Sequence, residues 1–201
     1  MPTPLDVEKQ RFTFGDSWAV AFKYDDSRLY RDGPERLKGE LEVGTDSATQ
    51  KTVPQATRAM DVIGLHPKDG LLLLEAKDFR GHRIENKHRM KGQVILEVAL
   101  KARDTVAGLL GAARNAVTGI PSSDLLVALQ PGRTVTVVLW LEDDTFRNEQ
   151  KTKAALNQLN GVLKAKLAWM NVRTLVQSSS APIKLRDVTV ANLSGAGQSS
   201  R

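Results

Sequence analysis

Three residues of this chain have the types and the spacing for metal-assisted chemistry: Asp61, Glu75 and Lys77. Glu75 follows Asp61 by fourteen positions and ends a run of four leucines, and Lys77 comes two positions later. Because side chains two positions apart on a strand point to the same face, Glu75 and Lys77 should share one face. Two carboxylates in one small volume repel each other, and either Lys77 or a hard divalent cation relieves that repulsion. The trio therefore predicts a metal site at Asp61 and Glu75.

Such a site would suit hydrolysis of a phosphodiester bond. A bound metal would polarise a phosphoryl oxygen and lower the pKa of a bound water, while Lys77 would orient that water or stabilise the developing negative charge. The competing interpretation is a structural ion pair, in which Lys77 only neutralises Asp61 and Glu75. Both interpretations stay open at the level of sequence.

The elements that must position these residues are a hairpin and a helix. Residues 59–65 and 71–76 are apolar and are separated by a turn segment that contains Pro67 and Gly70, which predicts two buried strands with Asp61 inside the first. Residues 94–114 carry apolar residues at three- and four-residue steps and predict a helix. Glu97 and Lys101 are expected to pair on the face of that helix opposite to the apolar one.

The rest of the chain predicts an α/β architecture. We expect strands at residues 18–24, 134–141, 173–177 and 184–191, and a short helix at residues 35–38 within the ambiguous stretch 28–43. Residues 44–57 indicate a loop. A second long helix follows the strand 134–141, with leucines inward and lysines outward: Leu156, Leu159, Leu163, Leu167, Met170, Lys151, Lys153, Lys164 and Lys166. Residues 1–193 are expected to form a single domain, and residues 194–201 a disordered tail.

Composition narrows the classes of function only modestly. The 201 residues include no cysteine, which excludes disulfide scaffolds, thiolate zinc sites and cysteine nucleophiles. The net charge of +6 is compatible with an anionic partner such as nucleic acid but does not require one. The N-terminus has no apolar signal-peptide core and no apolar run is long enough to span a membrane, so we expect a cytoplasmic location and no membrane partner.

A basic segment, residues 78–92, follows the proposed site. Four of its side chains are candidates for contact with a phosphate backbone: Arg80, His82, Arg83 and Lys87. A solvated charged loop explains the segment equally well. Zinc binding through His82 and His88 is disfavoured because no third ligand lies nearby.

Asp61, a turn, Glu75-Ala76-Lys77 and a long helix together resemble the PD-(D/E)xK nuclease superfamily over about residues 59–140. The resemblance implies a restriction-endonuclease-like mixed β-sheet flanked by helices. It implies that Asp61 and Glu75 bind Mg²⁺ or Mn²⁺, that the backbone carbonyl of Ala76 adds a ligand, and that Lys77 serves catalysis. The chain departs from the name-giving motif in carrying Met60 where that motif has proline.

The resemblance leaves several points open. Many members use a glutamate from an upstream helix, and four residues compete for that role: Glu8, Glu35, Glu40 and Glu42. Gln93 lies near the position of a glutamine that marks some members. The implied activity is cleavage of nucleic acid, DNA rather than RNA, in repair, restriction or defence, with a homodimer or a partner protein left open. The alternative is a non-catalytic nucleic-acid-binding or interaction module that retains the nuclease fold.

Overall fold

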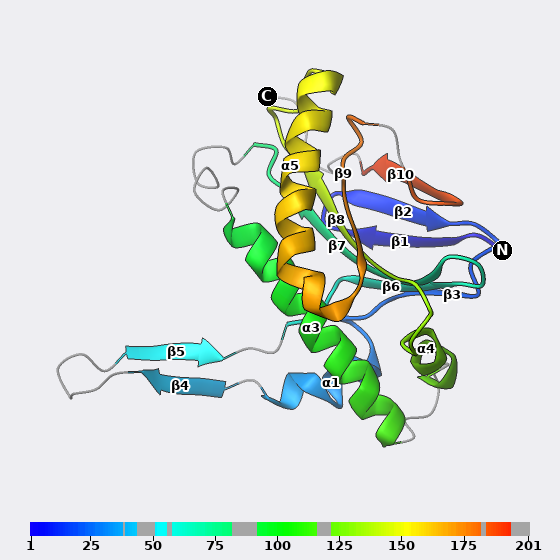
Figure 1. Ribbon diagram of the computed structural model, residues 1–201, viewed down its shortest axis with the longest axis vertical. Coiled ribbons are helices and arrows are strands. Elements are labelled where there is room, and N and C mark those ends of the chain that lie inside the picture. The colour runs from blue at the N-terminus through cyan, green and yellow to red at the C-terminus, as the bar shows by residue number, and fades with distance from the viewer. Residues whose placement is uncertain are drawn as a thin grey trace, which may run out of the picture.

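The structure is a computed structural model that describes residues 1–37, 39–43, 51–55, 58–81, 92–115, 122–181 and 184–193. For residues 36, 37, 39–43, 51–55, 122 and 123 it describes the backbone alone. The described residues form a mixed α/β architecture with two larger sheets, a separate two-stranded hairpin and flanking helices (Figure 1). No described helix has the length and the apolar character needed to cross a membrane.

The larger sheet has five strands in the order β3-β6-β7-β8-β9. Strands β3 (Val20–Lys23), β6 (Val62–His66) and β7 (Gly70–Asp78) pair antiparallel, whereas β8 (Val135–Glu142) and β9 (Arg173–Gln177) continue the sheet in parallel. A parallel pair needs a crossover connection. Helix α3 (Gln93–Arg114) with α4 (Ser122–Ala128) connects β7 to β8, and α5 (Glu149–Leu167) connects β8 to β9.

Alternation along β7 gives the sheet two different faces. Leu71 and Leu73 belong to a core that includes the apolar side chains of α3 and α5, such as Val98 and Leu163. Leu72, Leu74 and Ala76 belong to a second core on the opposite face. Because Glu75 and Lys77 are in step with Leu71 and Leu73, they face the helices, as the period of a strand requires.

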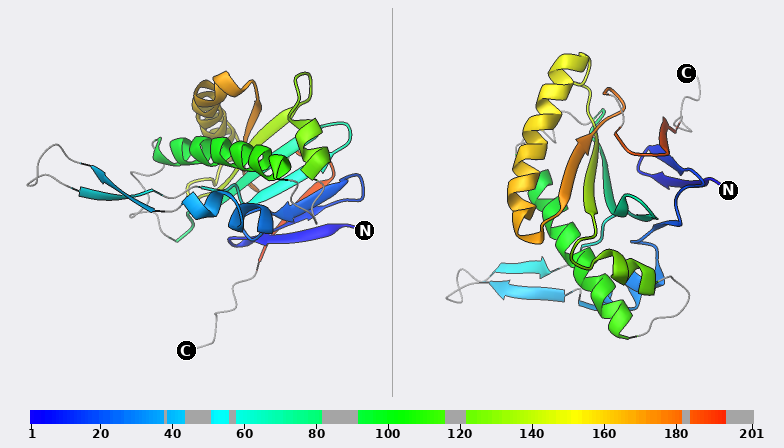
Figure 2. Two further views of the ribbon diagram at one scale, coloured as in Figure 1. Left: turned by 90° about the horizontal axis from the view of Figure 1, so that it is seen from below. Right: turned by 45° about the vertical axis from the view of Figure 1, so that its right-hand side comes forward.

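The second core lies between the large sheet and a small one, and Figure 2 shows these two sheets beside each other. The small sheet has the order β1-β2-β10 and consists of β1 (Thr3–Val7), β2 (Gln10–Phe14) and β10 (Val188–Asn192). Phe12 and Phe14 of β2 are fully buried, and Phe12 meets Trp140 of β8 edge to face, with ring centroids 5.5 Å apart. The two ends of the chain thus pair to cover one face of the large sheet.

A separate hairpin leaves the body of the molecule before Asp61. Its strands β4 (Gly39–Val43) and β5 (Lys51–Gln55) pair only with each other among the described strands and extend away from the two sheets (Figure 1). The short helix α1 (Arg28–Arg31) and the 3-10 helix η1 (Pro34–Leu37) precede it.

Most predicted elements are present, with several corrections. The helix expected at 94–114 and the strands expected at 134–141 and 173–177 are confirmed within one residue.

The loop expected at 44–57 is wrong for residues 51–55, because pairing with β4 gives this polar segment a strand conformation. Residues 44–50 and 56–57 lie outside the described part. Of the strand expected at 184–191, only residues 188–191 are extended. The expected tail 194–201 also lies outside the described residues. Strands β1 and β2 and helix α4 were not predicted.

Candidate functional site

Asp61 lies in a bend immediately before β6, not inside the strand as its apolar neighbours suggested. Val62, the first residue of β6, pairs with Leu74, so Asp61 and Glu75 occupy the next two facing positions. Helix α3 holds the backbone that leads to Asp61: the Thr105 hydroxyl accepts a hydrogen bond from the Met60 amide at 3.0 Å, and Asp104 accepts one from the Arg58 amide at 3.1 Å. The bend frees the Asp61 side chain to reach across to β7.

The predicted trio is brought together. Oδ2 of Asp61 accepts a hydrogen bond from the Ala76 amide at 2.8 Å. Nζ of Lys77 lies 2.8 Å from Oε1 of Glu75, which places both side chains on one face of β7 as predicted. Ala76 therefore meets Asp61 through its N–H, while its methyl group lies in the core on the other face of the sheet.

A further lysine, Lys101 of α3, lies among the predicted residues. Its Nζ is 2.6 Å from Oε1 of Glu75 and 3.5 Å from Oδ1 of Asp61. Glu97 and Lys101 were expected on the face of the helix opposite to the apolar one, and this expectation is wrong. Lys101 contacts Asp61 and Glu75, which we call the acid pair, and Glu97 lies 3.6 Å from Nζ of Lys77. Each of these side chains instead forms an ion pair with a residue of β7. In the sequence, the signal that could have indicated this placement is the spacing of Glu97 and Lys101 by one helical turn, which puts the two side chains on the same side of the helix.

The electrostatics of the site follow from the burial of Glu75, whose side chain has no solvent exposure. Burial raises the pKa of Glu75 to about 7, and repulsion from Asp61 adds to that effect, whereas Lys101 and Lys77 oppose it. Burial lowers the pKa of Lys77, but attraction from Glu75, Glu97 and Asp61 outweighs burial and leaves that pKa above its ordinary value. Lys77 is therefore a cation at neutral pH.

Asp25 adds a further acidic side chain in the neighbourhood of Asp61. Burial raises the pKa of Asp25 first, and the negative charges of Asp61 and Asp26 raise it further. Asp25 directly follows Tyr24, whose amide donates to the backbone carbonyl of Asp61 at 2.9 Å. The negative charge of Asp61 thus acts on Asp25, while Lys101 contacts Asp61 and Glu75 from the helix.

The fit of a divalent cation to this donor set depends on one particular atom, Oε2 of Glu75. That oxygen is buried and has no hydrogen-bond partner among the described residues. An unsatisfied carboxylate oxygen fits a hard cation, and Mg²⁺ commonly uses only one or two protein carboxylates and keeps several waters. Within the described part of the chain no cluster of three or more His, Asp or Glu side chains could hold a metal ion. Asp61 and Glu75 would thus be the side-chain ligands.

The residues predicted to complete the site have different outcomes. Glu8 lies in the turn of the small sheet, on the other face of the large sheet, which is the wrong side for Glu75. Glu35 belongs to η1, and the side chains of Glu40 and Glu42 lie outside the described part. Gln93 begins α3 and lies on the same helical stripe as Glu97 and Lys101, since four residues make about one turn.

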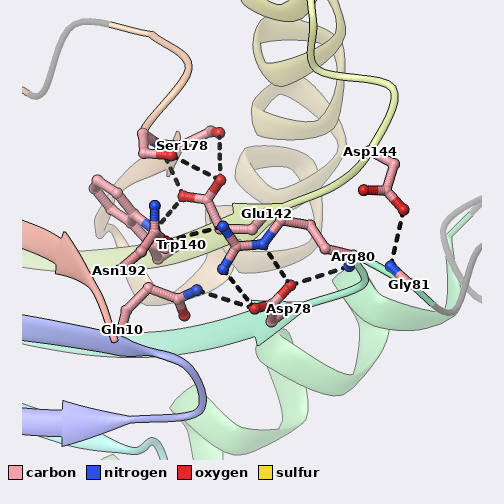
Figure 3. Close-up of polar contacts among 10 residues, drawn as sticks. Gln10, Asp78, Arg80, Gly81, Trp140, Glu142, Asp144, Ser178 and Asn192 are labelled. Carbon is pink, nitrogen blue, oxygen red and sulfur yellow. Dashed lines mark hydrogen bonds and ion pairs between the residues drawn. The ribbon is translucent and has the colours of Figure 1, made fainter. Parts of the chain in front are cut away.

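Of the predicted nucleic-acid contacts, the structure describes Arg80 alone, and His82, Arg83, Lys87 and His88 lie outside the described residues. The Arg80 guanidinium is held by Asp78 at 2.9 and 2.6 Å and by Asn192 of β10 at 2.9 Å. Gln10 of β2 donates to the same Asp78 carboxylate at 3.2 Å. Figure 3 shows that these side chains bridge the two sheets at the carboxyl end of β7.

Glu142 at the end of β8 forms a neighbouring part of this polar cluster (Figure 3). It is nearly fully buried and accepts hydrogen bonds from the Trp140 indole N–H at 2.8 Å and from the amide and hydroxyl of Ser179, both at 2.8 Å. A contact from the Ser178 hydroxyl at 3.3 Å completes its shell. Every oxygen of Glu142 is thus satisfied by protein donors, in contrast to Glu75, and Glu142 serves to join β8 to the segment after β9.

Comparison of the chain with protein-family models, curated proteins and solved structures gives no significant match.

Proposed function

We propose that the protein is a nuclease of the PD-(D/E)xK kind that depends on Mg²⁺ or Mn²⁺ and hydrolyses phosphodiester bonds of nucleic acid. DNA is the proposed substrate in preference to RNA. The observation that carries this proposal is the convergence of Asp61, Glu75 and Lys77 on one face of the large sheet, with one oxygen of Glu75 buried and unpartnered among the described residues. A buried, imperfectly compensated carboxylate pair is costly, and functional sites are where such groups gather.

The arrangement of the sheet also supports the proposal. The hairpin β6–β7 is followed by α3 and then by β8, which pairs in parallel with β7. This order agrees with the restriction-endonuclease-like core that the motif implies, and we propose that fold for the five strands with α3 and α5.

The residues would divide the chemistry among them. Asp61 and Glu75 would hold the divalent cation, which when bound supplies Lewis-acid polarisation of a phosphoryl oxygen. Lys77 is fixed between Glu75 and Glu97, so its ammonium is held in one place and stays charged at neutral pH. From that position Lys77 would orient the attacking water and stabilise negative charge that develops on the phosphate. Asp61 is in turn oriented by the Ala76 amide.

One observation favours the non-catalytic alternative. Oε1 of Glu75 already has two ammonium groups within 2.8 Å, from Lys101 and Lys77, so protein cations partly neutralise the acid pair. A nucleic-acid-binding or interaction module that retains the fold would keep this ion cluster and would not bind metal. Metal binding by Asp61 and Glu75 separates the two functions.

The test is cleavage of supercoiled plasmid, linear duplex, single-stranded DNA and RNA with Mg²⁺, Mn²⁺ or EDTA. We expect metal-dependent cleavage that falls at least about 100-fold in Lys77→Ala, because the group that stabilises the developing charge is removed. Lys68→Ala is the matched control, since Lys68 is an exposed lysine in the turn between β6 and β7. Absence of cleavage of every substrate, together with absence of Mn²⁺ binding, would contradict the nuclease and favour the module.

A further inference from the structure

We propose that Lys101 is an internal cation that holds Asp61 and Glu75 in place of a metal and must be displaced when the metal binds, so that it sets the metal affinity of the site. This inference rests on the proposed function, because it takes Asp61 and Glu75 as the metal ligands. It goes further by assigning a role to a residue of α3 that lies outside the Asp-Glu-Lys motif.

The geometry that supports this role is a bridge between the two acids. The Lys101 ammonium contacts Oε1 of Glu75 at 2.6 Å and Oδ1 of Asp61 at 3.5 Å. The other oxygen of Asp61 is taken by the Ala76 amide. Of the two Asp61 oxygens, the one that accepts no backbone hydrogen bond among the described residues is therefore the one that Lys101 contacts. A divalent cation shared by Asp61 and Glu75 and the Lys101 ammonium therefore compete for Oδ1 of Asp61 and for the same position between the two carboxylates.

Lys77 differs from Lys101 in this respect. Its ammonium is 2.8 Å from Oε1 of Glu75, and its second contact is Glu97 at 3.6 Å, on the helix. No ion pair joins Lys77 to Asp61 among the described residues. Lys77 can therefore keep Glu97 as its partner when a metal binds Glu75, whereas Lys101 would share both of its carboxylates with the metal.

The Lys101 side chain is able to leave. This side chain is 15% exposed and so lies partly at the surface, while Glu75 is completely enclosed. A lysine side chain is a flexible four-carbon stem with a strongly hydrated charge, and such a group exchanges a carboxylate partner for water at modest cost. The buried Glu75 has no solvent exposure, so its ionised form depends on a cation beside it.

The test measures Mn²⁺ binding by isothermal titration calorimetry with the full chain and no nucleic acid. The variants are Lys101→Met, Lys77→Met and Lys164→Met, where Lys164 is an exposed lysine on α5 that controls for loss of one positive charge. Removal of Lys101 both frees the oxygens and leaves the acids less neutralised, so we expect Mn²⁺ affinity to rise at least about tenfold. Lys77→Met should increase affinity less, and Lys164→Met should leave it unchanged.

The outcomes separate the inference from the proposed function. If the native chain binds Mn²⁺ and Lys101→Met binds no more tightly, the inference is overturned and the metal site stands. If neither the native chain nor folded Lys101→Met binds Mn²⁺, the metal-dependent function itself fails, and the inference fails with it. Binding by Lys101→Met alone would support the inference in its strongest form.

A second measurement on the native chain removes any dependence on the folding of a variant. Lysine acylation followed by mass spectrometry reports the accessibility of each ammonium group. With Mn²⁺ present we expect Lys101 to react faster than without it, because the ammonium has moved into solvent, while Lys164 is unaffected. An unchanged or slower reaction of Lys101 with Mn²⁺ bound would overturn the displacement.

Discussion

The Lys77 ammonium lies 2.8 Å from Oε1 of Glu75, and the two side chains share the face of β7 that meets α3. This contact stabilises a carboxylate that burial would otherwise force into its neutral form. Burial nevertheless dominates, because the pKa of Glu75 rises from an ordinary value of 4.5 to about 7 even with Lys101 and Lys77 beside it. Keeping both Asp61 and Glu75 ionised at this buried position is therefore electrostatically unfavourable.

The raised pKa of Glu75 predicts how stability changes with pH. A carboxyl group whose pKa is higher in the folded state binds more protons there than in the unfolded state. The contribution of Glu75 to the free energy of unfolding is therefore fully present below pH 4.5 and is lost as pH rises through about 7. The loss amounts to about 3 kcal/mol by order of magnitude. The raised pKa of Lys77 makes stability depend on pH only near and above pH 10.5, which is outside this window.

The measurement is urea unfolding of the native chain and of Glu75→Gln at several pH values between 4.5 and 8. A glutamine side chain does not titrate, so the Glu75→Gln variant should lose less free energy of unfolding across this range than the native chain does. Parallel pH curves for the two proteins would show that Glu75 titrates at its ordinary pKa.

The site could be predicted in part because its signals are local. Glu75 and Lys77 follow four leucines on one strand, and a period of two places them on one face. The hairpin turn then brings Asp61 opposite Glu75, as the register of β6 and β7 shows. Whether this constellation binds metal remains a prediction.

The contribution of Lys101 could not be predicted, because it depends on how α3 lies over the sheet. Periodicity identified the apolar stripe of the helix but assigned Lys101 to the opposite side. A lysine at the margin of an apolar stripe can turn to either side, and the buried carboxylates of β6 and β7 decide the direction. The small sheet was missed for a similar reason: β10 joins β2 across most of the chain, and no local pattern reports such pairing.

Arg80 was predicted to contact nucleic acid, and its contacts allow a sharper prediction. Three of its nitrogens are engaged by Asp78 and Asn192, which join β7 to β10. We expect Arg80→Ala to lower the free energy of unfolding by about 1–3 kcal/mol, because the largely buried Asp78 carboxylate loses its charged partner. We also expect no change in the salt dependence of DNA binding.

Thermal unfolding and DNA-binding titrations at several salt concentrations test both expectations. Arg133→Ala is a suitable control, since Arg133 is an exposed arginine before β8. A stable Arg80→Ala variant with a shallower salt dependence would instead assign Arg80 to the phosphate backbone.

Glu142 should behave as a structural residue. Its carboxylate satisfies the Trp140 indole N–H, which is buried with the fully enclosed Trp140 ring. Glu142→Ala leaves that donor without its acceptor and should cost about 3 kcal/mol or more, whereas Glu142→Gln keeps one acceptor oxygen and should cost less. Urea unfolding followed by tryptophan fluorescence measures both variants, and an equal cost for the two would contradict the hydrogen-bonding role.

Two glycines of α3 offer a matched test of how the helix packs against the segment before Asp61. A Cβ at Gly108 would clash with the hydroxyl oxygen of Tyr24 and lie 2.6 Å from Cγ of Pro34, while a Cβ at Gly111 would meet no atom within 4 Å. Tyr24 is fully buried, so its ring has little room to move away. Gly108→Ala should therefore destabilise the protein by about 1–3 kcal/mol despite the better helix propensity of alanine.

Gly111→Ala should instead stabilise the protein by up to about 1 kcal/mol, because alanine favours the helix and nothing opposes its methyl group. Thermal unfolding of the two variants beside the native chain gives the comparison. Because Thr105 of the same helix holds the Met60 amide next to Asp61, displacement of α3 by Gly108→Ala should also weaken Mn²⁺ binding, whereas Gly111→Ala should leave it intact. Equal stability of the two variants would mean that α3 does not pack closely on Tyr24.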